Sequence, residues 1–139
     1  MYTALKLSKY IVSKCIKEEK FISNLHLQKI LYFIQKDFLQ RGKIAFNDDI
    51  EAWQFGPVVP NVYYYFCGFG SMPISNLAGT FLIEEDKDAI DRIVEAKREL
   101  DPWDMVSETH RAGGAWAQVY NNGLGIRQVI PTELIKSEG

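Results

Sequence analysis

The stretch EAWQFGPVVPNVY at residues 51–63 restricts the backbone more than any other part of this chain. Pro57 and Pro60 each fix their own φ at about −65°. Val59 is biased to an extended conformation because it precedes a proline. Gly56 allows a positive φ and therefore predicts a break in the chain just before Pro57. A stiff corner is expected here, whatever the rest of the chain does.

This corner should present aromatic side chains from a rigid frame. Residues 51–55 predict a short strand, and Pro60 suits the first turn of a helix, where its missing N–H is no loss. The corner is either purely structural or a preorganised binding edge, because rigid aromatics lose little entropy on contact. The three consecutive tyrosines at 63–65 point in three directions, so at least one should be exposed. The candidate partner-binding residues are Trp53, Phe55, Pro57, Val58, Tyr64 and Tyr65.

A helix predicted at residues 24–41 should lie at the centre of the fold. Ser23-Asn24 offers a cap at its start, and Gly42 suits the position just beyond its end. A helix that is apolar on two sides is expected to have neighbours on several sides. The main stripe comprises Leu27, Ile30, Leu31, Ile34 and Phe38, and the second comprises Leu25, Tyr32 and Leu39.

Hydrophobic periodicity and capping residues predict further helices on either side. An amphipathic helix should run from Thr3 to about Lys17, and Asp101-Pro102 has the acidic cap and the proline that open another. We predict a mainly α fold in one compact domain over residues 1–139, with about five to seven helices and a short β-hairpin or strand element near residues 44–55. In that hairpin, residues 44–46 pair with residues 51–55. The other helices are expected at 60–66, 85–100, 116–120 and 131–135.

Charge is distributed unevenly along the chain. Residues 1–43 carry nine Lys/Arg against three Asp/Glu, and residues 44–139 carry seven against fifteen. The first part could meet nucleic acid or an acidic partner, or the two parts could attract each other within the fold. The basic face that would contact nucleic acid comprises Lys6, Lys9, Lys17 and Lys20.

The residues give little support to catalysis, to a cofactor or to a metal site. Cys15, His26, Cys67 and His110 occur singly, without the paired spacing of a zinc site. His110 stands near Ser107 without a nucleophile motif, and its expected role is a hydrogen bond within the fold. We therefore expect no enzyme, no cofactor and no metal. Lacking an apolar leader segment or a membrane-length apolar run, the chain is expected to be cytoplasmic and to make no membrane contact.

Three segments, in this order and spacing, resemble a known family. They are LQKILYF at 27–33, EAWxxGPVVPxVY at 51–63 and Thr109-His110. Together they resemble the Panacea domain, the SocA-like antitoxin family, which includes phage-associated proteins, and the similarity extends from about Leu5 to Ile135. The sequence departs from the family pattern after Thr109-His110, where Ala115-Trp116 stands in place of Pro-Trp.

The resemblance implies a function that composition and spacing do not. It implies a mostly helical module that neutralises a cognate protein toxin, encoded nearby, by direct contact. One branch of the family implies a protease adaptor that delivers its toxin for degradation, so a protease is a further possible partner. Prophage association is implied in the same way. The alternative is a nucleic-acid-binding regulator that uses the basic first helix, whose affinity would fall steeply with salt.

Overall fold

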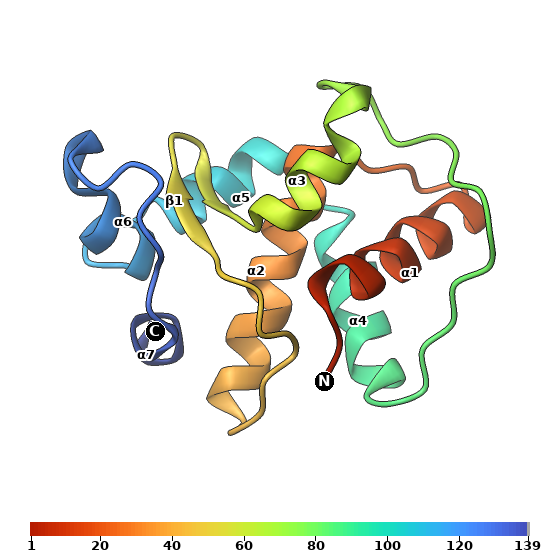
Figure 1. The fold of residues 1–139 in the computed structure, drawn as a ribbon, viewed down its shortest axis with the longest axis horizontal. Coiled ribbons are helices and arrows are strands. Elements are labelled where there is room, and N and C mark those ends of the chain that lie inside the picture. The colour runs from red at the N-terminus through yellow and green to blue at the C-terminus, as the bar shows by residue number, and fades with distance from the viewer. Residues whose placement is uncertain (139) are drawn as a thin grey trace.

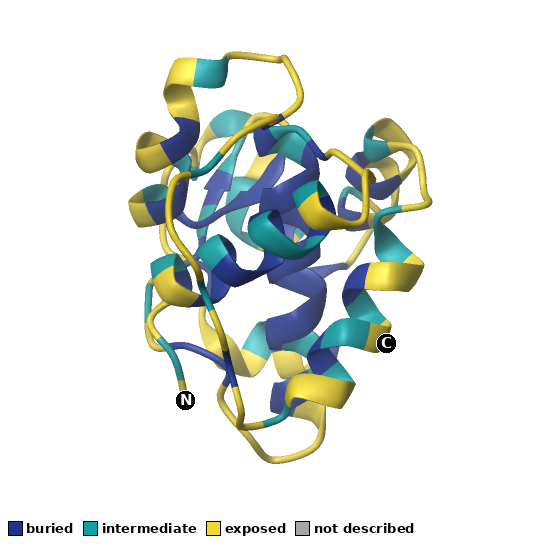
Figure 2. Cartoon of the chain, turned by 90° about the vertical axis from the view of Figure 1, so that its right-hand side faces the viewer, coloured by how far each residue is buried: buried dark blue, intermediate teal, exposed yellow. Residues whose placement is uncertain are grey.

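Helix α2 (Asn24–Gln40) is the element around which the chain folds. In the computed structural model, which describes residues 1–138, α2 is in contact with α1, α3, α4, α5 and α7. The Ser23 side chain caps the helix by accepting a hydrogen bond from the backbone N–H of His26 at 3.2 Å. Figure 1 shows α2 standing through the middle of the molecule, and Figure 2 shows buried segments gathered at the centre with exposed turns around them. The prediction of a central helix is confirmed.

The remaining helices surround α2, and the fold is mainly α as predicted. Residues 1–138 contain seven α-helices and a small two-stranded sheet. The Thr3 side chain caps the first helix and the Asp101 side chain caps the fifth, both as the sequence predicts. The other α-helices are α1 (Ala4–Lys17), α3 (Pro60–Phe66), α4 (Lys87–Lys97), α5 (Pro102–Thr109), α6 (Ala115–Tyr120) and α7 (Thr132–Ser137), with short 3-10 turns at Cys67–Phe69 and Asn121–Gly123.

The hairpin is formed by other residues than those expected to pair. β1 (Glu51–Trp53) pairs antiparallel with β2 (Gly56–Val58), so the strand folds back immediately rather than onto residues 44–46. Phe46 instead forms an isolated bridge with Tyr2. The opposite edge of β1 is also covered, because Ala52 N donates to Gln128 O at 2.9 Å and Arg127 N donates to Ala52 O at 2.6 Å. The alternation of apolar and polar residues along the chain did not indicate this two-residue turn. Contacts with other parts of the chain help to hold the returning strand in place.

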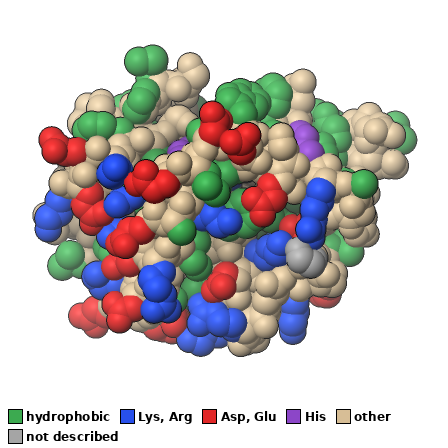
Figure 3. Space-filling model, turned by 180° about the vertical axis from the view of Figure 1, so that it is seen from behind, with side chains coloured by type: hydrophobic (Ala, Val, Ile, Leu, Met, Phe, Trp, Pro, Cys, Tyr) green, Lys and Arg blue, Asp and Glu red, His purple; other side chains and the backbone are tan. Residues whose placement is uncertain are grey.

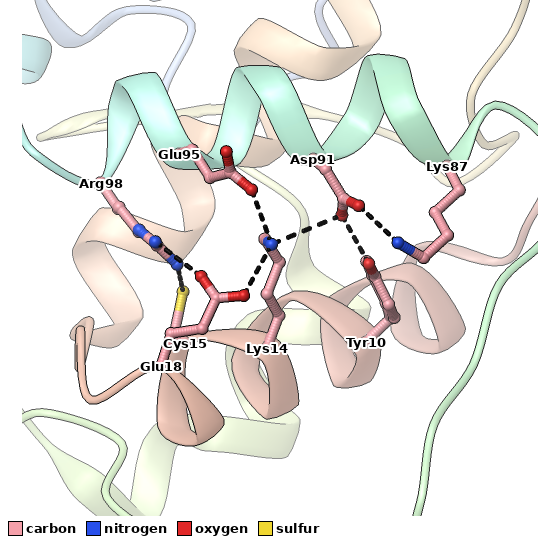
Figure 4. Close-up of polar contacts among 8 residues, drawn as sticks. All are labelled: Tyr10, Lys14, Cys15, Glu18, Lys87, Asp91, Glu95 and Arg98. Atoms are coloured by element: carbon pink, nitrogen blue, oxygen red, sulfur yellow. Dashed lines mark hydrogen bonds and ion pairs between the residues drawn. The ribbon is translucent and has the colours of Figure 1, made fainter.

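A polar seam joins α1 to α4 (Figure 4). Lys14 lies between three acids and contacts Glu18 at 2.8 Å and Glu95 at 2.7 Å. Burial alone would lower the pKa of Lys14, but its hydrogen bonds to Glu18 and Glu95 outweigh burial and raise it. Arg98 reaches back from the end of α4 to Glu18 at 2.7 Å. The basic and acidic parts of the chain therefore attract each other within the fold.

The end of the described chain is docked on α2. The buried carboxylate of Glu138 accepts hydrogen bonds from Tyr32 Oη at 2.9 Å and from Ala115 N at 2.6 Å. Ile135 on α7 is fully buried. These contacts fix the start of α6 and thereby the position of Trp116. Among the helices of residues 1–138, none combines the length and the apolar character needed to cross a bilayer.

We predict that Leu27→Asp abolishes folding. Leu27 is fully buried on α2. The lost apolar burial costs about 2–3 kcal/mol, and an unpaired buried carboxylate adds several more. A domain of this size has about 5–15 kcal/mol in total. Circular dichroism should show no cooperative thermal transition, whereas Leu25→Asp, at a half-buried position on the same helix, should keep one. A cooperative transition for Leu27→Asp close to that of the unaltered chain would contradict the central role of α2.

Candidate partner-binding groove

Two side chains of α2 fasten the β1–β2 hairpin to the core. Lys29 Nζ donates to Pro57 O at 2.9 Å, and Gln28 Oε1 accepts from Val59 N at 2.8 Å. The Gln28 side chain is held in turn, because its Nε2 donates to Asn24 Oδ1 at 3.0 Å. The hairpin and the extended residues after it are therefore fixed to the central helix by hydrogen bonds from buried side chains.

Lys29 is fully buried, which is unusual for a lysine. Burial disfavours the ammonium form and lowers the pKa of Lys29 to about 7. A neutral amine still donates, so the bond to Pro57 O persists in either protonation state. Gly56 makes room for the lysine: a Cβ at Gly56 would lie 3.0 Å from Lys29 Cε and 2.8 Å from Thr109 Oγ1. The positive φ of Gly56, +109°, also favours glycine.

The Thr109-His110 pair ends α5 beside this buried lysine. Thr109 Oγ1 donates to Val106 O at 2.8 Å. Burial, and then the nearby Lys29 charge, lower the pKa of His110. The expected hydrogen bond of His110 is not its main contact: within residues 1–138, His110 Nε2 has no hydrogen-bond partner. Its ring instead stacks on Trp116, with centroids 3.6 Å apart.

Trp116 connects this stack to the hairpin. Its Nε1 donates to Trp53 O at 2.8 Å, and its ring also stacks on Tyr120 at 4.5 Å. Residues from all three of the sequence segments that carried the resemblance thus meet at one place: Lys29, Gly56-Pro57 and Thr109-His110. Their shared role is to hold the hairpin in one position.

The outer side of the hairpin forms one wall of a groove of about 750 Å³. The start of α5 also lines the groove, and there Trp103 lies edge to face with Phe55 at 5.2 Å. Phe55 is 47% exposed and Trp103 is 55% exposed, so both rings remain open to a partner. The groove also borders Trp53, Val58, Tyr63, Ile126 and Arg127.

Arg127 stands at the rim of the groove in a left-handed backbone conformation, with φ +66°. Its guanidinium lies over the Trp53 ring, 4.2 Å from the centroid, and its Nη1 donates to Tyr64 Oη at 3.0 Å. Trp53 also packs edge to face on Tyr63 at 4.9 Å. The rim is therefore an ordered cluster of aromatic rings with one cation.

The six predicted partner-binding residues differ in whether they reach the groove. Trp53, Phe55 and Val58 line the groove, and Tyr64 reaches its rim through Arg127. Pro57 is buried, and its carbonyl is taken by the lysine beneath it.

Tyr65 points toward a different part of the surface. Its ring receives Lys9 Nζ of α1 at 4.8 Å from the centroid. Tyr64 and Tyr65 are both about half exposed, as expected of consecutive tyrosines. Pro57 and Tyr65 therefore do not line the groove.

Sequence reasoning missed two residues of this surface, Trp103 and Arg127. Trp103 was not among the predicted partner-binding residues, yet it is more than half exposed at the first turn of α5. An exposed aromatic next to a helix-opening Asp-Pro was the available signal. No local pattern pointed to Arg127, because its partner Trp53 lies far away along the chain.

The four lysines of the expected basic face differ in their contacts. Lys9 lies over Tyr65 and near Phe81, and Lys20 pairs with Glu99 at 3.4 Å. Lys6 lies 5.8 Å from the centroid of the Tyr2 ring, and Lys17 is exposed at the end of α1. Figure 3 shows acidic and basic side chains interspersed over the lower part of one face of the molecule. Of these four lysines, Lys20 is thus partly neutralised by an acid just beyond the end of α4.

The described residues offer no assembled metal site. Within residues 1–138, no three His, Cys, Asp or Glu side chains are placed to hold a metal ion. Asp48, in the acidic turn before β1, accepts instead from Ala4 N and from Asn61 Nδ2, both at 2.9 Å.

Comparison with known proteins identifies the family. The sequence pattern of the family described as "Antitoxin SocA-like, Panacea domain" matches residues 27–117. That match covers more than half of the chain and contains Lys29, Gly56-Pro57 and Thr109-His110. The chain belongs to the SocA-like Panacea family.

One curated relative supports the same assignment. The protein named Antitoxin SocA, from Caulobacter vibrioides (strain NA1000 / CB15N), is 34% identical over an alignment of 125 residues, and the match covers 76% of this chain and 66% of the relative. The chain thus spans slightly less than two thirds of that relative. No solved structure matches the chain. Arg127 lies beyond the part of the Panacea domain that the family pattern matches.

We predict that the buried lysine makes stability depend on pH. The folded pKa of about 7 lies below the value of about 10.4 in an unfolded chain, so the unfolded state binds more protons between them. The free energy of unfolding of the unaltered chain should rise, relative to Lys29→Met, by about 1.4 kcal/mol per pH unit above pH 7. This gain is complete above the unfolded pKa and is lost as pH falls to about 7. Urea unfolding of both proteins from pH 6 to pH 9 measures it, and parallel curves would contradict it.

We predict that Gly56→Ala destabilises the fold more than Gly42→Ala. Both glycines have positive φ, which costs alanine about 1–2 kcal/mol. Only Gly56 has side chains within 3.0 Å of the added Cβ, whereas Gly42 has no atom within 4 Å. The clash should add about 1–3 kcal/mol at Gly56. Denaturant titrations compare the two variants, and equal losses would show that the close approach to Lys29 and Thr109 is not tight.

Proposed function

We propose that this chain is an antitoxin that neutralises a cognate protein toxin in the cytoplasm, by direct contact through the aromatic groove. The observation that carries the proposal is a preorganised groove with two half-exposed aromatic rings in a chain of the Panacea family. The relative named Antitoxin SocA supports the same class of function. A toxin encoded next to this chain is the first partner to test.

The groove has the properties of a protein-binding hot spot. Such sites are enriched in tryptophan and tyrosine and take up anchoring side chains in pockets. Trp53 is held by Trp116 through its carbonyl, and Phe55 lies in the turn that the buried lysine fixes beneath it. Because the rings are already ordered, binding would require little further loss of side-chain entropy.

Direct masking and delivery to a protease make different demands on this chain. Direct masking needs a surface that contacts the toxin, and we assign that role to the groove. Protease delivery and prophage association rest on the resemblance alone. In a purified system, inhibition of the toxin by this chain without any protease supports direct masking, and toxin loss that requires a protease supports delivery. A binding role also accounts for the site without any catalytic step.

The test is co-expression with each reading frame adjacent to the gene of this chain. The proposal predicts that one neighbour arrests growth alone, that this chain restores growth, and that the two purify as a complex. Absence of rescue by this chain for every toxic neighbour would contradict the proposal.

We predict that removing either exposed ring weakens the complex without unfolding the chain. Phe55→Ala and Trp103→Ala should each raise the Kd for the captured toxin by about 30-fold or more, since central aromatic anchors contribute about 2 kcal/mol or more. Leu82→Ala is the matched control, because Leu82 is also apolar and is 75% exposed, but it does not line the groove. Calorimetric titration measures the three affinities, and thermal melts check folding. Equal affinities for all three variants and the unaltered chain would place the interface elsewhere.

A further inference from the structure

Arg127 has a strained backbone that the surrounding structure maintains. A φ of +66° is uncommon for a residue with a long side chain and marks a conformation held by its surroundings. Arg127 N donates to Ala52 O at 2.6 Å, and Ala52 N donates to Gln128 O at 2.9 Å. The edge of β1 thus fixes the backbone on both sides of the Arg127 Cα.

The Arg127 side chain is held in place, and most of its N–H donors are still free to bind a partner. Its guanidinium lies over the Trp53 ring, and Tyr64, which accepts its one hydrogen bond within residues 1–138, packs on the same ring at 6.0 Å. A guanidinium has five N–H donors in a planar fork. Most of them therefore remain for a partner, on a group that the Trp53 ring and the Tyr64 hydroxyl already hold in place.

We propose that Arg127, Trp53 and Tyr64 form a receptor for one carboxylate of the toxin, and that the adjoining groove takes a bulky apolar side chain of the same segment. The proposal rests on the proposed function for the identity of the natural partner. An arginine held flat against an aromatic ring presents its donors to a carboxylate in the paired geometry that gives strong, charge-assisted bonds.

The apolar half of the recognition follows from what lies next to Arg127. Ile126, directly before it, borders the groove together with Phe55 and Trp103. Ile126 is itself about half exposed, so the apolar surface continues up to the guanidinium. A partner segment that pairs with Arg127 would place its neighbouring side chain into the groove. We therefore expect an aspartate or glutamate within a few positions of a tryptophan, phenylalanine or leucine.

The charge of the groove favours a single carboxylate over a nucleic acid. Aromatic rings with arginine also bind single strands, but such sites follow the backbone with a series of cations. Here the ionisable Lys, Arg, Asp and Glu side chains bordering the groove are Arg127, the buried Lys29 and Asp101. The Asp101 carboxylate is engaged in capping α5, where it accepts from Trp103 N at 2.8 Å. A single exposed cation matches one acidic side chain rather than a series of phosphates.

The test uses a displayed library of short random peptides as the probe, so that it does not depend on finding the toxin. The library is selected on the unaltered chain and counter-selected on Arg127→Gly. Glycine is the sharpest substitution here, because it removes the guanidinium and relieves the left-handed backbone. Its thermal midpoint should equal or exceed that of the unaltered chain, while the affinity for selected peptides falls about tenfold to a hundredfold.

Two further variants separate shape from charge. Arg127→Lys keeps the charge but loses the planar fork, so it should bind the selected peptides more weakly than the unaltered chain. It also keeps the test decisive if Arg127→Gly does not fold. Arg92→Ala removes an exposed arginine on α4, away from the groove, and should leave peptide affinity unchanged.

The outcomes are distinct. Enriched peptides with an acid beside a bulky apolar residue, and a loss of affinity in both Arg127 variants, support the receptor. Peptides without an acid, no enrichment, or equal affinity for Arg127→Gly overturn it. Binding of an oligothymidylate probe that is lost in Arg127→Gly would assign the rim to nucleic acid and overturn it as well. If the toxin complex survives Arg127→Gly, the antitoxin function stands and only the carboxylate receptor is overturned. If peptides bind through Arg127 but no toxin complex is found, the receptor stands and the antitoxin function is overturned.

Discussion

The hydrogen bond from Lys29 to the carbonyl of Pro57 is the contact on which the candidate site depends. It joins the most buried helix to a hairpin of two three-residue strands, which would be marginal alone. Enclosing a lysine costs free energy, and burial accordingly lowers the pKa of the amine to about 7. The same enclosure needs a residue without Cβ above the lysine, and Gly56 fills that position. Helix α2, the β1–β2 hairpin and the end of α5 thus all pack around the Lys29 side chain.

The consequences of this contact reach the surface. With the hairpin fixed beneath, Trp53 and Phe55 are presented without freedom to collapse onto the core. Trp116 holds the other side of the hairpin through the Trp53 carbonyl, and Glu138 fixes the start of the helix that carries Trp116. The buried polar network and the exposed aromatic groove are two sides of one arrangement. Rigidity inside allows an interface outside that loses little entropy on binding.

Sequence reasoning reached the elements that depend on local order. The double apolar stripe of residues 24–41 indicated a central helix, and Ser23, Thr3 and Asp101 marked helix starts correctly, because caps and periodicity act over a few residues. The predicted strand partner of residues 51–55 was wrong, because the chain turns back at Gln54-Phe55 and the returning strand is held by Lys29 at Pro57 O and, just beyond it, by Gln28 at Val59 N. The charge asymmetry left two outcomes open. The ion pair of Lys14 with Glu95 shows that α1 and α4 attract each other, and nucleic-acid binding stays a prediction. The groove itself combines residues from five separate segments, so periodicity could not reveal Trp103 or Arg127 as members.

Hydrogen–deuterium exchange of this chain with and without its captured toxin tests the central claim most directly. Amides are protected where a partner excludes water or suppresses local opening. The account predicts that toxin binding protects residues 53–58, the start of α5 and residues 126–128, while the outer face of α4 exchanges as before. Protection confined to α1 and α4, with the groove segments unchanged, would contradict it and would place the interface on the charged face.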